Sequence, residues 1–390
     1  MKYMVDNKYP KIKKSVYMND VFINNKGKGY YVIGNKENDS QLLVSVKDAN
    51  FFKKLMSKLD GKSDIDKLVS EGIGTYNQVC KAIDLLKSHG LIEGTESKKS
   101  YNEAESLSIK LIKKTFNEVD DVTQKKQQDI CSKIMKVSKV ILAISIICFF
   151  YLIAVNFSEI FEENSISYWL SYKSGDVNSV FLGYLFINFS MILMFLIHET
   201  FHVITGIEKG IRPAYFSFIL FLGFMPMFYI KNRNIYTLKK KDIIKVLLAG
   251  VYSNLILFFI LIDLFFVFKI EFIKILAMAN LRMVFVNLIP ISLTDGYFIY
   301  TLIFNRPNLR MKFHKFLADP RRLKEYKKSD LIFICVFLAS ILLTINFELM
   351  WIISDIGLGL VYKVILVIVI NIIYILTLHY MDKKKFGIKG

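Results

Sequence analysis

Cysteine and proline are scarce in this chain, which has 4 cysteines and 6 prolines among 390 residues. The cysteines stand far apart, with no CxxC pair, at Cys80, Cys131, Cys148 and Cys335. This spacing excludes a disulfide framework. The N-terminal sequence MKYMVDNKYPKIKK contains no apolar run, so no cleavable signal peptide is expected.

Acidic residues are also few: 34 Asp and Glu stand against 52 Lys and Arg, for a net charge of +18. The basic residues cluster beside apolar segments, and this placement favours the positive flanks of membrane helices over nucleic-acid binding. Hydrophobic residues make up 53% of the chain, and several apolar runs reach the ~20 residues that a spanning helix needs. We therefore expect a polytopic α-helical membrane protein with a soluble N-terminal domain.

About six segments are predicted to cross the membrane as helices. They are 137–157, 180–206, 243–267, 275–304, 330–350 and 357–380. A further apolar stretch, Tyr215–Ile230, is rather short for a crossing and is interrupted by Gly223 and Pro226. It is predicted to form a re-entrant hairpin or an interfacial strand pair, whose backbone must be covered by protein.

The charges of the loops predict the orientation. If the N-terminal domain is cytoplasmic, the inner loops carry 21 Lys and Arg and the outer loops carry 3. We therefore expect a multi-pass protein of the cell membrane with both termini in the cytoplasm. The basic block from Arg306 to Lys328 is favoured as an orientation signal, and binding of anionic lipid headgroups is the alternative.

The segment His198-Glu199-Thr200-Phe201-His202 lies inside the second predicted span. Residues i and i+4 share one helix face, so both imidazoles can reach a single metal ion. Zinc is the natural candidate, with Glu199 as the base that activates water. A packed structural histidine is the ordinary alternative, but three ionisable side chains within five membrane residues are costly without a partner.

A third ligand should be a carboxylate at the same depth, and Asp295 fits. It lies roughly 13 Å from the inner end of its span, and the histidines lie roughly 6–12 Å from the same face. Pro290 and Gly296 predict irregular backbone around Asp295, as at a cavity. Asn254 and Asn287 are predicted to be buried amides that bind substrate or form hydrogen bonds between helices.

These motifs resemble the site-2 protease family of intramembrane zinc metalloproteases. The resemblance covers about residues 180–304 and includes HExxH, the segment Ala249–Asn254 and the segment Asn287–Gly296. It implies zinc held by His198, His202 and Asp295, Glu199 as general base and acid, and a substrate-binding role for Asn254 and Asn287. Departures from the family pattern replace no ligand: they are Val251 for proline, Thr294 for leucine and Phe201 for glycine.

The N-terminal part reads as a small α+β winged-helix-like domain, with strands VFIN, YYVIG and QLLVSV and helices over 48–59, 64–70 and 76–89. Gln41–Glu93 is similar to PqqD-like leader-peptide-recognition domains, and a generic winged helix is the alternative. The predicted domains are 1–95 for peptide binding, 96–136 as a charged linker and helix, 137–380 as the membrane protease, and 381–390 as a basic tail.

The preferred hypothesis is an intramembrane zinc metalloendopeptidase that matures or exports a peptide. Its expected partners are a peptide or single-span membrane protein substrate and the lipid bilayer, with a peptide-export transporter as a further candidate and no nucleic acid. Two alternatives stay open. One is regulated cleavage of a signalling protein, and the other is a non-catalytic peptide receptor or immunity protein.

Overall fold

The computed structural model describes most of the chain. The described residues are 9–24, 27–36, 40–96, 108–116, 119–156, 177–221, 225–290, 294–307, 309–321, 326, 328–354 and 360–385. They fall into two compact units, Met1–Val284 and Phe285–Gly390. The division lies inside 137–380, the segment that the sequence assigns to one membrane domain. Much of the loop 158–179, which is predicted to lie outside the cell, and the end of the basic tail are not among the described residues.

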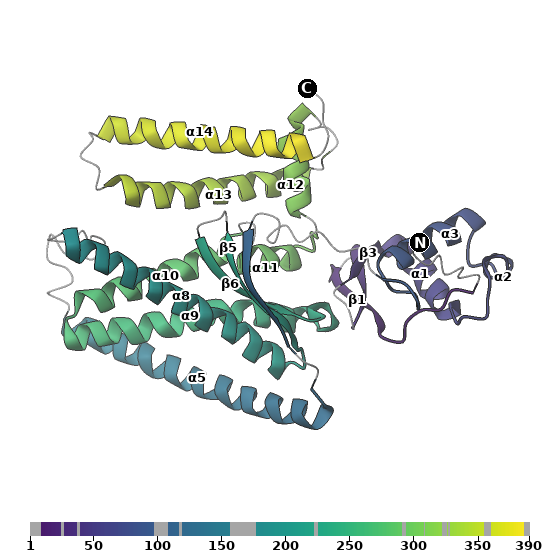
Figure 1. Cartoon of the computed structure of the whole chain (residues 1–390), viewed down its shortest axis with the longest axis horizontal. Helices are drawn as coiled ribbons and strands as arrows, with labels where there is room; N and C mark the ends of the chain where they lie inside the picture. Colours follow the sequence, from purple (N-terminus) through teal and green to yellow (C-terminus); the bar gives the residue numbers. More distant parts are fainter. Residues whose placement is uncertain are drawn as a thin grey trace. The chain divides into compact units, whose positions relative to one another are not determined.

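The N-terminal domain has the strands and helices that its sequence predicts (Figure 1). They are β1 (Val16–Ile23), β2 (Gly29–Asn35), β3 (Gln41–Ser45), α1 (Val46–Lys58), α2 (Ile65–Ser70) and α3 (Tyr76–Ser88). The strands pair antiparallel in the order β1-β2-β3. After α3, Ile92 forms an isolated antiparallel bridge with Ile12.

Local sequence explains where these helices begin. The side chains of Ser45, Asp64 and Thr75 accept hydrogen bonds from the backbone amides of Asp48, Lys67 and Gln78, and so cap α1, α2 and α3. Such caps satisfy amides that have no partner within the helix. Together, the helices and the sheet enclose a core that includes the fully buried Ile33, Leu55, Leu68, Val79 and Leu86.

Three long helices of the first unit lie side by side: α5 (Asp121–Val155), α8 (Val177–Glu208) and α9 (Lys240–Phe268) (Figure 1). Their bounds agree with the predicted apolar segments, although α5 begins earlier. Aromatic contacts join α5 to α9, since the ring of Phe149 lies 6.1 Å from that of Phe258 and 5.3 Å from that of Phe259.

Among the described residues, α5 and α9 are long and apolar enough to cross a membrane. Two shorter apolar helical segments are Asp330–Ser340 and Val364–Thr377. Many large apolar side chains of α5 are exposed, including Val137, Ile144, Ile147 and Phe150. An apolar solvent such as lipid would remove the cost of exposing them to water.

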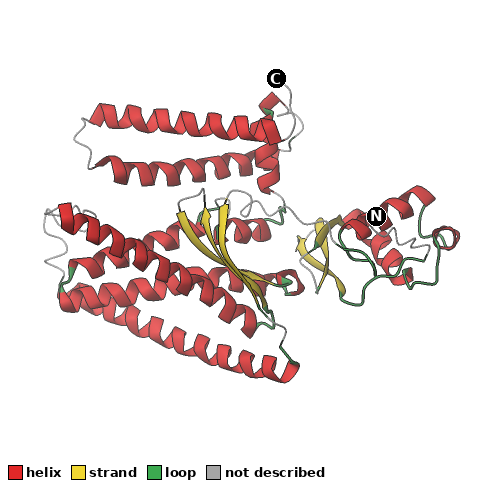
Figure 2. Ribbon diagram, viewed as in Figure 1, coloured by secondary structure: helices red, strands yellow, loops and turns green. Residues whose placement is uncertain are grey.

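A second sheet packs beside the long helices (Figure 2). It contains β4 (Ser108–Thr115), β5 (Pro213–Phe221) and β6 (Met225–Asn232), in the order β4-β5-β6. The hairpin β5–β6 confirms the predicted strand pair over Tyr215–Ile230. The strand β4 is a finding that the sequence did not predict, because its residues were assigned to the charged linker.

The predicted span 275–304 is interrupted in the structure. Helix α10 runs over Glu271–Leu288, and helix α11 begins at Asp295 and ends at Ile303. The predicted irregular backbone near Pro290 is therefore confirmed. Because α11 is helical from Asp295 to Ile303, the predicted rise of about 1.5 Å per residue applies over this segment.

The second unit continues with α12 (Leu309–Ala318), α13 (Lys328–Ser354) and α14 (Leu360–Lys385). Helices α13 and α14 pack together, and α12 contacts both. The buried carboxylate of Asp330 accepts hydrogen bonds from Arg306 at 3.1 Å and from Lys312 at 2.9 Å. These ion pairs hold the start of α13 to α12 and the segment before it.

Candidate metal centre

Helix α8 places two histidines on one buried face. His198 and His202 are 4% and 6% exposed, and their Nε2 atoms lie 3.2 Å apart. The spacing of four residues brings the rings to the same side of the helix, as the sequence predicts. Two ligands of a tetrahedral zinc ion, each at 2.0–2.1 Å, are separated by roughly 3.3 Å. The observed separation of the two Nε2 atoms therefore suits one shared ion.

The Nδ1 atoms of both rings contact polar groups of α9. His202 Nδ1 lies 2.7 Å from the carbonyl oxygen of Val246. Because a carbonyl oxygen only accepts, Nδ1 must carry the proton, and in the neutral ring Nε2 keeps its lone pair for a metal. His198 Nδ1 lies 3.1 Å from Asn254 Nδ2. The contact of His202, in which a ring N–H donates to a carbonyl oxygen, is of the kind that orients metal-binding histidines in known sites.

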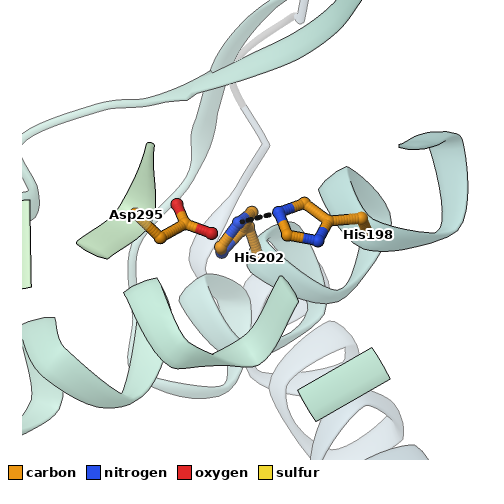
Figure 3. Close-up of side chains that lie close together, drawn as sticks. All are labelled: His198, His202 and Asp295. Atoms are coloured by element: carbon orange, nitrogen blue, oxygen red, sulfur yellow. Dashed lines mark hydrogen bonds between the residues drawn. The ribbon is translucent and has the colours of Figure 1, made fainter. Parts of the chain in front are cut away.

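Asp295 supplies the third candidate ligand. One ligand atom from each of His198, His202 and Asp295 lies within 4.8 Å of the other two (Figure 3). Two imidazoles and one carboxylate form a set suited to zinc, with a fourth position left for water or substrate. The predicted set of three ligand residues is therefore brought together in the structure.

A glycine makes room for the two imidazoles. A Cβ atom placed on Gly250 of α9 would lie 2.3 Å from His198 Nε2 and 2.6 Å from His202 Nε2. Both distances are far inside van der Waals contact, so any larger residue must displace a ring. The space beside the two Nε2 atoms therefore depends on the missing side chain, and it fits the zinc ion that the ligand set implies.

A second glycine shapes the turn before Asp295. A Cβ on Gly296 would lie 2.4 Å from the carbonyl oxygen of Leu288 and 2.7 Å from that of Ile289. The hydroxyl of Thr294 also donates a hydrogen bond to Ile289 at 2.8 Å. These contacts hold the end of α10 close to the first turn of α11, where Asp295 is located.

Glu199 lies beside the histidines and is half buried. Its Oε2 accepts a hydrogen bond of 2.9 Å from the backbone amide of Ile230 in β6. The amide of Arg233 instead donates to Arg212, the residue before β5. Successive amides of a strand point to opposite edges. Because Ile230 lies three residues before Arg233, its amide faces away from β5. Thus Glu199 contacts the edge of β6 that is not paired with β5.

The two predicted asparagines are not ligands in the group above. Asn254 of α9 contacts His198 of α8, which is the hydrogen bond between helices predicted as the alternative to substrate binding. Asn287 is half buried near the end of α10, and its predicted role in substrate binding stays a prediction. Sequence reasoning missed Val246 and Ile230 because they act through backbone atoms, which leave no signal in the side-chain pattern.

Comparisons of the chain with protein-family models, with curated proteins and with solved structures find no match. The function of the chain therefore has to be inferred from the chemistry of these residues.

Proposed function

We propose that this chain is an intramembrane zinc metalloendopeptidase of the site-2 protease type, with about six membrane-spanning helices. The observation that carries the proposal is the grouping of ligand atoms from His198, His202 and Asp295, with Glu199 directly after His198 in the chain. Two apolar helices of sufficient length support a membrane location. The remaining spans and the cytoplasmic termini are part of the proposal, supported by the loop charges.

Peptide hydrolysis would require a different role from Glu199 than from the three metal-binding residues. Zinc, when bound, would polarise the scissile carbonyl and lower the pKa of water. In this proposal Glu199 would take a proton from water and pass it to the leaving amine. Its hydrogen bond with Ile230 would fix the direction of the carboxylate during this transfer. The two histidines and Asp295 would hold the metal in place.

The sheet offers a way to present an extended peptide to this site. The outward amide of Ile230 lies on the β6 edge beside Glu199. An extended segment that paired with this edge would bring its own backbone next to the candidate base. Proteolysis needs an unwound substrate, because a helix keeps its amides hydrogen-bonded within itself. This arrangement supports a peptide substrate over a small molecule.

We further propose that the N-terminal domain captures a leader peptide by strand addition. In the order β1-β2-β3, the outer edge of β3 pairs with no other strand in the described part of the chain. An unpaired edge of this kind is a common peptide-binding surface. Capture of a leader favours a role in peptide maturation or export. Regulated cleavage of a signalling protein and a non-catalytic receptor are the competing roles.

The first test is metal content. Detergent-purified wild type, His202→Ala, Asp295→Ala and the control His89→Ala are compared by elemental analysis. We expect about one zinc per chain in wild type and the control, and strongly reduced zinc in the other two, because each loses a ligand. Folded wild type that contains no zinc after purification and takes up none would rule out the protease function.

Replacement of the base separates catalysis from metal binding. We expect Glu199→Gln to keep its zinc and to lose at least about 100-fold in hydrolysis of a quenched-fluorescent peptide library, because the amide cannot accept the proton. Wild-type cleavage by this variant would contradict the assignment of Glu199. Absence of cleavage by zinc-loaded wild type would instead favour the receptor.

A further inference from the structure

The contact between Asn254 and His198 has a chemical consequence for metal binding. Asn254 Nδ2 is a donor only, so in the described arrangement the His198 Nδ1 atom is the acceptor. A neutral imidazole then carries its proton on Nε2, which lies 3.2 Å from His202 Nε2. This Nε2–H can donate to His202, but it cannot bind a metal.

Metal binding requires the other tautomer of His198. Its Nε2 must then hold a lone pair toward the ion, and its proton must move to Nδ1. The Nδ1–H group needs an acceptor, since an unsatisfied buried donor is costly. The neighbouring Nδ2 of Asn254 would be a second donor facing it. The contact therefore has to change when the ion binds.

We propose that Asn254 is a positioning residue for His198, and that its side-chain amide turns over to present Oδ1 to His198 Nδ1–H when zinc binds. An asparagine amide carries an acceptor and a donor in nearly equivalent positions, so a half-turn exchanges them without moving the helix. The same residue can therefore support both tautomers of the ring. The inference rests on the proposed zinc site.

The surroundings of Asn254 favour this exchange. The residue is completely buried, and its Oδ1 has no hydrogen-bond partner. Turning the amide therefore breaks no hydrogen bond to Oδ1, while it supplies the acceptor that the Nδ1–H group needs. After the turn, the acceptor that had no partner is satisfied by the histidine. The turn therefore gives Oδ1 a partner and moves Nδ2 to the position that Oδ1 left.

A second buried asparagine provides a matched control. Asn280 of α10 is also completely buried and also has an Oδ1 without a partner. Its Nδ2 contacts Met194 Sδ at 2.9 Å and the carbonyl oxygen of Leu276 at 3.1 Å. Neither of these two contacts involves a histidine, so a general effect of removing a buried amide can be separated from an effect on His198.

The experiment measures metal binding by the full chain in detergent. Wild type, Asn254→Leu, Asn254→Asp and Asn280→Leu are titrated with zinc against a chelating dye, and the visible absorption of the Co²⁺-substituted protein is recorded. We expect Asn254→Leu to weaken zinc binding by about 10–100-fold and to alter the Co²⁺ bands. Asn254→Asp, which keeps an acceptor, should restore both, and Asn280→Leu should match wild type.

Two outcomes would overturn the inference while leaving the protease proposal intact. One is a folded Asn254→Leu variant with the zinc affinity and the Co²⁺ bands of wild type. The other is an Asn254→Asp variant that is as impaired as Asn254→Leu, since an acceptor would then be insufficient. Wild type that binds neither metal would overturn the zinc site itself, together with this inference.

Discussion

At the scale of the residue, the positions of the two histidine rings depend on the absence of a side chain in the neighbouring helix α9. A Cβ atom at Gly250 would lie too close to both Nε2 atoms for any side chain to be accommodated there. The backbone of α9 also supplies the Val246 carbonyl that holds His202. Helix α8 therefore provides the two histidines, and α9 provides the space beside them and part of their orientation. Metal affinity should respond to changes in α9 even where no ligand is altered.

We predict that Gly250→Ala loses most of its zinc affinity. The added methyl group would push at least one imidazole away from the shared point, because it would otherwise lie 2.3 Å from His198 Nε2. The measurement is a zinc titration on detergent-purified protein. We expect a loss of at least about 10-fold, as for other groups that orient metal ligands.

Gly206→Ala is the matched control for this prediction. Gly206 lies on the same helix as the histidines, and a Cβ there would lie 3.5 Å from the nearest atom, Asn232 Oδ1, which is an ordinary contact. Wild-type affinity is expected for Gly206→Ala. Equal zinc affinity of both variants and wild type would contradict the role of Gly250.

At the scale of the element, β6 connects the sheet to Glu199, the proposed catalytic base. We predict that Ile230→Pro keeps its zinc and cleaves peptides about 10-fold more slowly or worse. Proline removes the amide that donates to Glu199, and a hydrogen bond to a charged group contributes about 1.5–3 kcal/mol. Because this amide faces the outer edge, the pairing of β6 with β5 should survive.

The neighbouring position gives the opposite expectation. Tyr229 pairs with Ser217 of β5, and its amide faces that strand by the alternation of the ladder. Tyr229→Pro should therefore destabilise the sheet and lower the melting temperature, whereas Ile230→Pro should not. Ile230→Pro with unchanged cleavage per bound zinc would show that the contact with Glu199 has no catalytic effect.

The elements built from local patterns could be predicted, and those built from distant contacts could not. The spacing of His198 and His202 and the break near Pro290 both follow from rules of the helix. Strand β4 carries Lys110, Lys113 and Lys114 and reads as a charged linker, because the partner that makes it a strand lies about a hundred residues further on. The contacts of Asn254 and Ile230 are likewise non-local.

At the scale of the whole molecule, the asymmetry of charge predicts the topology. We expect an epitope tag at either terminus to be digested by protease in inverted membrane vesicles and protected in right-side-out vesicles. A tag inserted in the outer loop 158–179 should show the reverse pattern and serves as the control. Termini that respond differently from each other would require an odd number of spans and would contradict the six-span arrangement.

The position of β4 in the chain has a consequence for synthesis. At about 5–20 residues per second, the ribosome needs roughly 5–20 s to make the ~100 residues between β4 and β5. During that interval the long apolar helices α5 and α8 are synthesised, and β4 has no partner strand. Its lysines are the kind of residue that discourages an unpaired strand from joining other chains. The lysines that make β4 resemble a linker in the sequence would thus protect the nascent protein from pairing with other chains until the β5–β6 hairpin has been synthesised.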